Sequence, residues 1–242
     1  MTISTSDNQK KGITVAIDGF SSSGKSTMAK RLAKAVGYRY VDSGAMYRAV
    51  TLSAIRHSLI APGKDTKDID AGEIARLSEN LSIDFKIMPD GSQHTLLNGE
   101  DVETEIRGME VSSCVSPVAA IPEVRSTLTV LQRQLGAEGG IVMDGRDIGT
   151  TVFPHAELKV YVSASPETRA RRRWLELKAK GDEQPYESIL ANVKERDHID
   201  MTREVSPLRK ADDAVELDNS EMSVEQQDRW LRDQFDNSLS RK

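Results

Sequence analysis

The sequence contains very little cysteine: one residue, Cys114, among 242. A single cysteine excludes an internal disulfide and a zinc site built from several cysteines, and it fits a reducing cytoplasm. We expect Cys114 to be a small buried residue rather than a nucleophile. The four histidines have no metal-ligand spacing, so the sequence predicts no histidine metal site.

Long apolar runs are missing as well. No run approaches the ~18 residues that a transmembrane helix needs. Residues 1–11 are polar and lack the apolar segment of a signal peptide, so we expect them to form a disordered tail. These absences predict a cytoplasmic protein with no membrane partner.

The chain has no excess of positive charge. Its 33 lysine and arginine residues face 38 aspartate and glutamate residues, which gives a formal net charge of -5. This balance argues against general binding to nucleic acid or to anionic membranes. Binding to phosphate must therefore depend on local arginine clusters. At this length, with 38% hydrophobic residues, residues 12–242 can form one domain with a substantial core.

The strongest motif lies near the amino terminus, where residues 13–27 read ITVAIDGFSSSGKST. An apolar run at 13–17 predicts a buried strand, and GFSSSGKS fits the phosphate-binding pattern G-x-x-x-x-G-K-[ST]. Lys25 places a charge near the β- and γ-phosphates, and the Ser26 hydroxyl can bind Mg²⁺. Backbone N–H groups of such a loop converge on phosphate. The candidate ATP-binding residues are Gly19, Phe20, Ser21, Ser22, Ser23, Gly24, Lys25, Ser26 and Thr27.

Apolar runs and helical patterns alternate along the rest of the chain. Helices are predicted between the strands, among them 108–116, 123–135 and 185–196, and the last helix has a capping box formed by Ser223 and Gln226. This alternation predicts an α/β fold with a five-stranded, doubly wound parallel sheet flanked by helices. The five predicted strands are 13–17, 38–41, 140–143, 158–162 and 214–217.

One stretch departs from this alternation. Residues 81–85 and 94–97 read as strands, and the dipeptide Asn98-Gly99 is a strong hairpin signal. These residues predict a small antiparallel insert within the α/β pattern.

Beyond the loop, the sequence favours a small-molecule kinase. GTPases need an N-K-x-D base-reading motif, which is absent, and motor ATPases usually have longer chains. Asp144 ends an apolar strand, as a Mg²⁺-binding Walker B carboxylate does. Arg146 follows at the carboxyl end of the same strand, where open α/β sheets bind ligands. We expect Asp18, just before the loop, to give structural support.

A basic helix is predicted to begin at Pro166 and to end at Gly181. It carries arginines at positions 169, 171, 172 and 173, and those at 169, 172 and 173 share a face. We predict a helical lid at residues 166–184 that closes arginines over the transferring phosphate. Arg172 is our candidate catalytic residue from this helix, together with Lys25, Asp144 and Arg146.

Five segments resemble the bacterial cytidylate kinase family: GFSSSGKST, DSGAMYR, Glu105-Ile106-Arg107, MDGRDIGTTVFPHA and KERDHIDMTREVSPL. The resemblance extends from residue 13 to the last helix. It implies the P-loop kinase strand order 2-3-1-4-5, and it implies that residues 66–105 form a CMP-side subdomain. It also implies Mg²⁺-dependent transfer of the ATP γ-phosphoryl group to CMP or dCMP, by an enzyme that we expect to be a monomer.

The resemblance also implies roles for acceptor-site residues. Ser43, Tyr47 and Arg48 match the nucleotide-binding segment. In the family pattern, Arg48, Arg146 and Arg203 would bind the CMP phosphate, Ser116, Arg125 and Asp147 would read cytosine, and Arg196 and Asp200 would contact the pentose.

Two alternatives stay open at this point. A kinase of another small acceptor, such as shikimate or dephospho-coenzyme A, would have a similar loop and similar arginines. A non-catalytic nucleotide-binding module would bind ATP without turnover.

Overall fold

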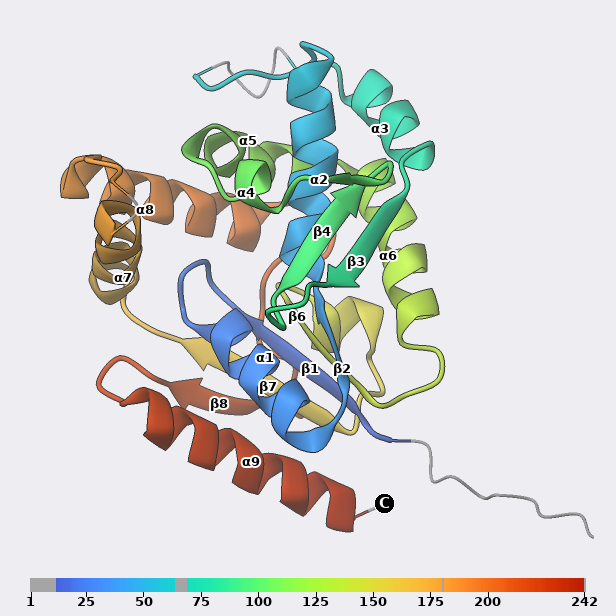
Figure 1. The fold of residues 1–242 in the computed structure, drawn as a ribbon, viewed down its shortest axis with the longest axis vertical. Helices are drawn as coiled ribbons and strands as arrows, with labels where there is room; N and C mark the ends of the chain where they lie inside the picture. Colours follow the sequence, from blue (N-terminus) through green and yellow to red (C-terminus); the bar gives the residue numbers. More distant parts are fainter. Residues whose placement is uncertain (1–11, 64–68, 180, 242) are drawn as a thin grey trace, which may run out of the picture.

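The computed structural model describes residues 12–63, 69–179 and 181–241. The predicted tail at 1–11 and the first residues of the predicted insert, 66–68, lie outside this range. Figure 1 shows a central sheet with helices on both faces. Strands β1 (Thr14–Gly19), β2 (Arg39–Asp42), β6 (Ile141–Gly145), β7 (Leu158–Ser163) and β8 (Val215–Asp218) make up this sheet.

All neighbouring strands of the central sheet are parallel, in the order β2-β6-β1-β7-β8. Counted along the chain, this is the order 2-3-1-4-5, so the predicted fold class is confirmed. Strands β1 and β6 are buried over nearly their whole length, as their continuous apolar runs require. Their carboxyl ends carry Asp18 and Asp144, which therefore lie at one edge of the sheet.

Alternate residues of β1 face two separate cores. Val15 and Ile17 pack on the layer of α1 (Lys25–Val36) and α9 (Val224–Ser240). Ala16 faces the opposite core, formed with α2 (Ser43–Arg56), α5 (Met109–Ala120) and α6 (Pro122–Leu135). Because side chains alternate along a strand, β1 is packed on both faces, and the phosphate loop that follows it lies between the two helical layers.

The antiparallel insert is present as a three-stranded sheet. Strands β3 (Ile83–Ile87), β4 (Gln93–Leu97) and β5 (Glu100–Asp101) lie in that order, between α3 (Ala71–Glu79) and α4 (Glu103–Ile106). Asn98 and Gly99 turn the chain with φ values of 51° and 85°, as the hairpin signal predicts. The Gln93 side chain donates to the Tyr40 carbonyl, which ties the hairpin to edge strand β2.

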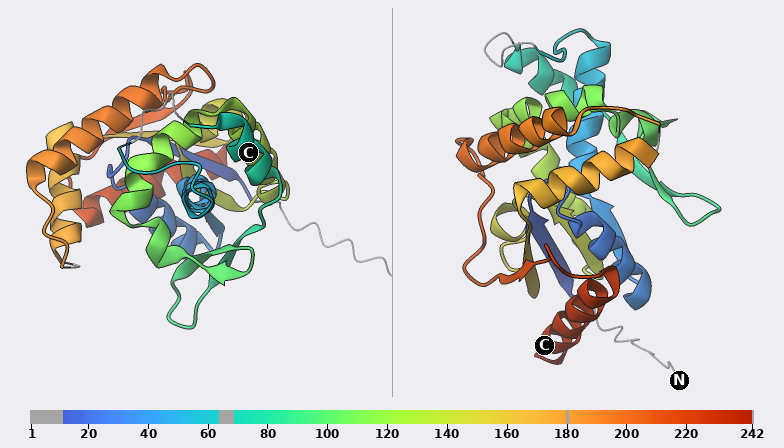
Figure 2. Two further views of the ribbon diagram at one scale, coloured as in Figure 1. Left: turned by 90° about the horizontal axis from the view of Figure 1, so that it is seen from above. Right: turned by 90° about the vertical axis from the view of Figure 1, so that its left-hand side faces the viewer.

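A helical hairpin projects beside the sheet (Figure 2). Helices α7 (Pro166–Ala179) and α8 (Tyr186–Thr202) pack on each other around a small apolar cluster that includes Ala170 and Val193. This cluster is separate from the two cores that flank the sheet. The hairpin therefore has its own packing, and it carries candidate residues from both the lid and the acceptor site.

Helix ends agree with several sequence signals. Gly37 ends α1 in a left-handed conformation with φ 71°, Asp42 caps α2 by accepting from the Ala45 N–H, and Ser223 and Gln226 form the capping box of α9. The predicted helix at 108–116 instead continues through Pro117, because the residues that follow it, such as Val118, are buried in the core. The predicted helix at 185–196 extends to Thr202.

Candidate active site

The phosphate loop connects β1 to α1 and depends on backbone that glycine permits. A Cβ on Gly19 would lie 2.2 Å from the Val162 carbonyl oxygen, so only glycine fits there. Gly24 has φ 89°, and Ser22 also adopts a left-handed conformation with φ 56°. Lys25 is in the first turn of α1, and its ammonium donates to the Phe20 carbonyl at 3.0 Å. The loop is therefore shaped by its own backbone.

Lys25 is buried among charged groups of both signs. Burial and the charge of Arg146 lower its pKa to about 7, although Asp144 and Asp42 act in the opposite direction. A bound phosphate would favour the charged form of this lysine.

Asp144 is buried beside the loop, and hydroxyl groups occupy both of its carboxylate oxygens. Ser26 donates to Oδ2 and Tyr40 donates to Oδ1, each at 2.7 Å. Burial and the nearby charge of Asp42 raise the pKa of Asp144. Because the Ser26 proton is directed to Asp144, the lone pairs of the Ser26 oxygen are free for a cation. These two side chains fit a Mg²⁺ ion, which the Ser26 oxygen would hold beside the Asp144 carboxylate.

The site forms one cavity of about 460 Å³ that begins at the phosphate loop and ends between α2, α5 and α8. All ten candidate acceptor residues line this cavity, as do the four candidate catalytic residues. From the loop, Ser21, Ser22, Gly24, Lys25, Ser26 and Thr27 line it, whereas Gly19, Phe20 and Ser23 lie behind. The acceptor residues are Ser43, Tyr47, Arg48, Ser116, Arg125, Arg146, Asp147, Arg196, Asp200 and Arg203.

The end of the cavity farthest from the loop is polar and buried. Arg125 forms an ion pair with Asp147 and also donates to the Ala119 carbonyl. The guanidinium of Arg125 lies over the Tyr47 ring, 5.3 Å from its centroid. Ser116, on α5, is only 3% exposed. A planar group that enters here would meet a carboxylate, a cation and a hydroxyl.

Arg203 lies at this far end. Its guanidinium is 3.9 Å from Asp147 and 3.7 Å from Asp200, and it donates to the Ser206 carbonyl. The family pattern groups Arg203 with the arginines that bind the acceptor phosphate. The structure places it instead beside the Arg125–Asp147 pair.

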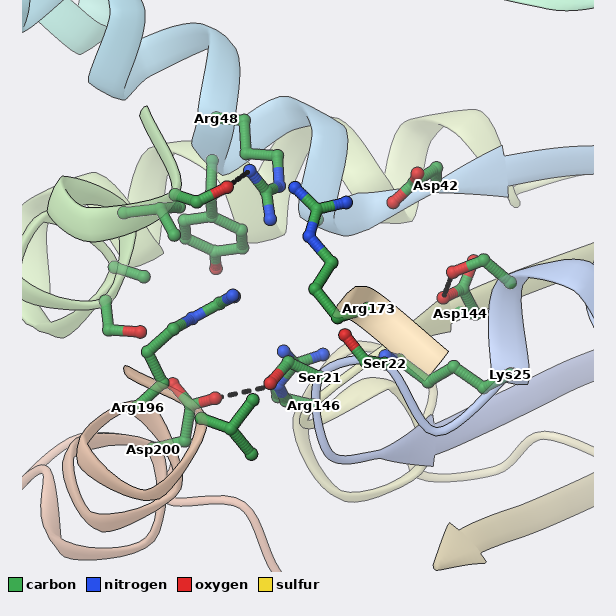
Figure 3. Close-up of a pocket in the computed structure, with 18 of the residues that line it drawn as sticks. Ser21, Ser22, Lys25, Asp42, Arg48, Asp144, Arg146, Arg173, Arg196 and Asp200 are labelled. Atoms are coloured by element: carbon green, nitrogen blue, oxygen red, sulfur yellow. Dashed lines mark hydrogen bonds and ion pairs between the residues drawn. The ribbon is translucent and has the colours of Figure 1, made fainter. Parts of the chain in front are cut away.

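Several guanidinium groups surround the middle of the cavity, and Figure 3 shows those of Arg48, Arg173 and Arg196 directed into the same space. Arg48 is held by the Ile106 carbonyl and the Ser112 hydroxyl. Burial and the charge of Arg146 lower the pKa of Arg196 to about 10. Burial and the charge of Arg196 likewise lower the pKa of Arg48. Such a cluster of cations is typical of a site for an anion.

Asp200 fixes Arg146 in this cluster. The Arg146 Nε–H donates to Asp200 at 2.8 Å. Burial acts to raise the pKa of Asp200, but the charges of Arg146 and Arg196 hold it below its usual value.

The lid arginines have different environments. Arg169 is fully buried, where it pairs with Asp197 of α8 and donates to the Ala164 carbonyl, so it does not line the cavity. Arg172 lines the cavity, but its guanidinium donates to the side chain and the carbonyl of Asn219. Arg173 reaches across the cavity to the Arg107 carbonyl at 3.0 Å. The shared helical face therefore divides into one structural arginine and two at the cavity.

Sequence reasoning missed several residues of the site. Asp42 and Arg107 line the cavity as an ion pair at 2.8 Å. Burial acts to raise the pKa of Asp42, but Arg107 holds it below its usual value. Both residues stand in the segments DSGAMYR and Glu105-Ile106-Arg107, so a signal was present. Tyr40 has no motif, and only the strand pairing reveals its contact with Asp144.

Asp18 is buried under the loop. Its carboxylate accepts the N–H groups of Ile148 and Gly149, each at 2.7 Å. Burial raises the pKa of Asp18 to about 7, although these two N–H groups act to lower it. We expected Asp18 to give structural support, and the structure shows which part it supports: Asp18 holds the turn that follows Asp147.

Two kinds of feature are absent from the described part of the chain. Among residues 12–63, 69–179 and 181–241, no three His, Cys, Asp or Glu side chains are grouped as a metal site would need. None of the helices in that part is both long and apolar enough to cross a membrane.

The parallel sheet with strand order 2-3-1-4-5, the loop between β1 and α1, and the arginine-lined cavity define a P-loop kinase. The cytidylate kinase family model matches residues 15–228. The chain belongs to the cytidylate kinase family.

Two curated relatives are both named cytidylate kinase. The relative from Bacteroides fragilis is 57% identical and is aligned over 95% of this chain and 99% of its own length. The relative from Bacteroides thetaiotaomicron is 58% identical over 93% of this chain and 97% of its own length. Among solved structures, a shikimate kinase from Bacteroides thetaiotaomicron is 12% identical, with a TM-score of 0.39 and coverage of 95% of each chain. A likeness of that size carries no argument about the acceptor.

Proposed function

We propose that this nucleoside monophosphate kinase transfers the γ-phosphoryl group of ATP to CMP or dCMP with Mg²⁺, giving CDP or dCDP and ADP. One observation carries the proposal: a single cavity joins the phosphate loop to the buried Arg125–Asp147 pair, with arginines between them. Such a cavity suits two nucleotides whose phosphates meet in the middle.

The phosphate loop would bind the donor, ATP. Residues 19–27 would hold the ATP phosphates, with Lys25 near the β- and γ-phosphates. Ser26 would hold Mg²⁺, which supplies charge neutralisation between the phosphates, and Asp144 would fix the Ser26 hydroxyl.

Acceptor binding would divide along the cavity. Arg48 and Arg146 would bind the CMP phosphate, Arg196 and Asp200 the pentose, and Ser116, Arg125 and Asp147 the cytosine. Ionised Asp147 can only accept hydrogen bonds, so it suits the amino group of cytosine and opposes the O4 atom of uracil. The position of Arg203 beside Asp147 favours a role at the base and pentose rather than at the phosphate.

Phosphoryl transfer requires positioning and charge neutralisation. We propose no general base, because the CMP phosphate oxygen is already a competent nucleophile. Lys25, Arg146 and Arg173 would offset charge on the transferring group, and the α7–α8 hairpin would exclude water. Arg172 would act at the donor end, where its contact with Asn219 supports the loop.

The test is steady-state turnover with CMP, dCMP, UMP and AMP side by side. We expect CMP to be preferred over UMP by at least ~100-fold in catalytic efficiency, because an acceptor-to-acceptor clash replaces a charge-assisted hydrogen bond. Turnover of shikimate or dephospho-coenzyme A instead of CMP would refute the proposed acceptor. ATP binding without any turnover would indicate a non-catalytic module.

Two variants extend this test. Lys25→Met should lower turnover by ~1000-fold, because one preorganised charge contact is lost, and it should leave CMP binding nearly unchanged.

Asp147→Asn should narrow the difference in catalytic efficiency between CMP and UMP, because an amide can turn its NH₂ group toward O4. An equal loss on both acceptors would show that Asp147 does not read the base.

We further propose that the enzyme acts as a monomer in the cytoplasm without a nucleic-acid partner. The single cysteine supports the cytoplasmic location, and the net charge of -5 supports the absence of a nucleic-acid partner.

A further inference from the structure

Asp18 lies one residue before the donor loop, yet its side chain contacts the acceptor side of the site. In β1 it pairs with Gly145 of β6 and with Tyr161 of β7, so its backbone is fixed in the centre of the sheet. Its carboxylate accepts the N–H groups of Ile148 and Gly149, which follow the acceptor-site residue Asp147. Asp18 therefore connects the strand that leads into the donor loop with the turn that follows Asp147.

The two amides belong to the turn that positions Asp147. Ile148–Val152 forms a single π-helical turn, and the Asp147 carbonyl accepts from the Thr151 N–H at 2.8 Å. The Asp147 carboxylate then pairs with Arg125 at the far end of the cavity. With each of its oxygens bound to one amide, the Asp18 carboxylate fixes the orientation of this turn.

There is little freedom for the turn to adjust. A Cβ on Gly149 would lie 3.3 Å from the Asp18 carboxylate, and one on Gly145 would lie 2.4 Å from the Ser43 hydroxyl. Ser43 also donates to the Asp144 carbonyl at 2.6 Å. The segment 144–149 is thus held from α2 on one side and from β1 on the other.

We propose that Asp18 is a positioning residue for the acceptor, which sets Arg146 and Asp147 relative to the donor loop through the amides of Ile148 and Gly149. This inference rests on the proposed function. Asp18 would touch no ligand itself. It would nevertheless affect acceptor binding and base discrimination, with little effect on the neighbouring donor loop.

The main variant is Asp18→Asn. An amide can accept one of the two N–H groups, but its NH₂ group would face the other donor, so the turn must reorient. We expect the dissociation constant for CMP, measured by calorimetry, to rise about tenfold, as the loss of one charge-assisted hydrogen bond predicts. We expect the CMP preference over UMP to shrink by a similar factor, while the dissociation constant for ATP stays within about twofold.

The matched control is Lys159→Met. Lys159 packs its aliphatic chain near Gly149 and ties the same region through the Pro154 carbonyl and Asp213, but it does not contact the amides of Ile148 and Gly149. We expect this variant to lower stability without changing the CMP preference. If it shifts CMP binding and base discrimination as Asp18→Asn does, Asp18 merely stabilises the turn and the inference is wrong.

Two further measurements keep the inference testable. Asp18→Glu retains both acceptors but displaces the turn, so it should weaken CMP binding while keeping more of the base discrimination than Asp18→Asn. In a double variant with Asp147→Asn, the effects on discrimination should not add, because both residues act through the same contact. Equal weakening of ATP and CMP binding in Asp18→Asn would overturn the inference. Absence of CMP turnover in the natural sequence would refute the proposed function, while the binding comparison would still test Asp18.

Discussion

At the scale of single residues, the two hydroxyl groups that donate to Asp144 come from different parts of the sequence. Ser26 belongs to the loop motif, whereas Tyr40 contributes from the edge strand β2, 104 positions away in the sequence. Its ring is covered by the Lys30 ammonium, 5.4 Å from the centroid, and its carbonyl accepts from Gln93. Tyr40 therefore has few ways to move away from Asp144.

Removal of this hydroxyl should weaken the metal site. In Tyr40→Phe, Oδ1 of Asp144 loses its donor and the carboxylate can rotate away from Ser26. We expect the Mg²⁺ concentration for half-maximal turnover to rise about tenfold, and the added thermal stability that Mg²⁺ gives to the ADP-bound protein to shrink. CMP binding should not change.

Tyr38→Phe is the control for this prediction. The Tyr38 hydroxyl accepts from the Ile13 N–H at 3.1 Å, just before the starts of β2 and β1 and so at the edge of the sheet opposite the site. This variant should lose stability but keep the natural Mg²⁺ dependence. Identical Mg²⁺ curves for Tyr40→Phe and the natural sequence would contradict the role of Tyr40.

Asp18 should also give stability a pH dependence. Its pKa is raised from 3.8 to about 7 in the folded state, so the folded protein binds this proton more tightly than the unfolded chain. The contribution to stability is fully present below pH 3.8 and is lost as the pH rises through 7. Relative to Asp18→Asn, the free energy of unfolding should fall by up to ~1.4 kcal/mol per pH unit between pH 4 and 7. Urea unfolding at several pH values measures this difference, and parallel curves would contradict it.

Sequence patterns predicted the roles of some of these residues but not the contacts of others. Lys25, Ser26, Asp144 and Arg146 carry local motifs, and the structure brings them together at one edge of the sheet. The contact of Asp18 with Ile148 spans 130 positions and depends on strand register and on an unpredicted π-helical turn. No local pattern encodes such a contact.

At the scale of elements, the α7–α8 hairpin joins lid and acceptor residues in one packed unit. The sequence predicted a basic helix, and the direction of each arginine depended on α8, which runs six residues beyond its predicted end at Arg196 to Thr202. That extension carries Asp197, the partner of Arg169, and Asp200, the partner of Arg146. The predicted lid at 166–184 therefore omits the part of the hairpin that lines the acceptor site.

The base of the hairpin should stay closed with or without ligand. Arg169 also donates to the Ser21 carbonyl, and its guanidinium lies 4.8 Å from the Phe20 ring centroid, so the start of α7 is tied to the phosphate loop. In hydrogen exchange, residues 169–172 should be protected in the free protein. Residues 174–179 and 186–189 should slow only when ATP and CMP are both bound. Equal exchange of this second group in free and liganded protein would exclude a closing lid.

Loss of the buried ion pair should be costly. Arg169→Leu leaves the Asp197 carboxylate without its partner, so we expect the free energy of unfolding to fall by roughly 3 kcal/mol. Urea denaturation measures this loss. The exposed ion pair between Arg232 and Asp236 offers a control, and Arg232→Leu should change stability by less than about 1 kcal/mol.

At the scale of the whole molecule, a cationic cavity lies within a protein of net charge -5. A cleft of this kind concentrates field lines and attracts a phosphate dianion. Raising the ionic strength from about 20 mM to 500 mM shortens the Debye length to a few ångströms, so kcat/KM for CMP should fall roughly tenfold. Arg196→Gln should flatten this dependence. Lys210→Gln, which removes a cation paired with Glu216 outside the cavity, should not.

The loop and the end of the chain are linked by Asn219. Its side chain donates to the Ser23 carbonyl at 2.7 Å, across 196 positions of sequence, and to Gln227 of α9. During synthesis, β1 and α1 leave the ribosome long before Asn219, because 196 positions separate it from Ser23. A nascent chain therefore lacks this support for its nucleotide loop until Asn219 has been synthesised and has folded against Ser23.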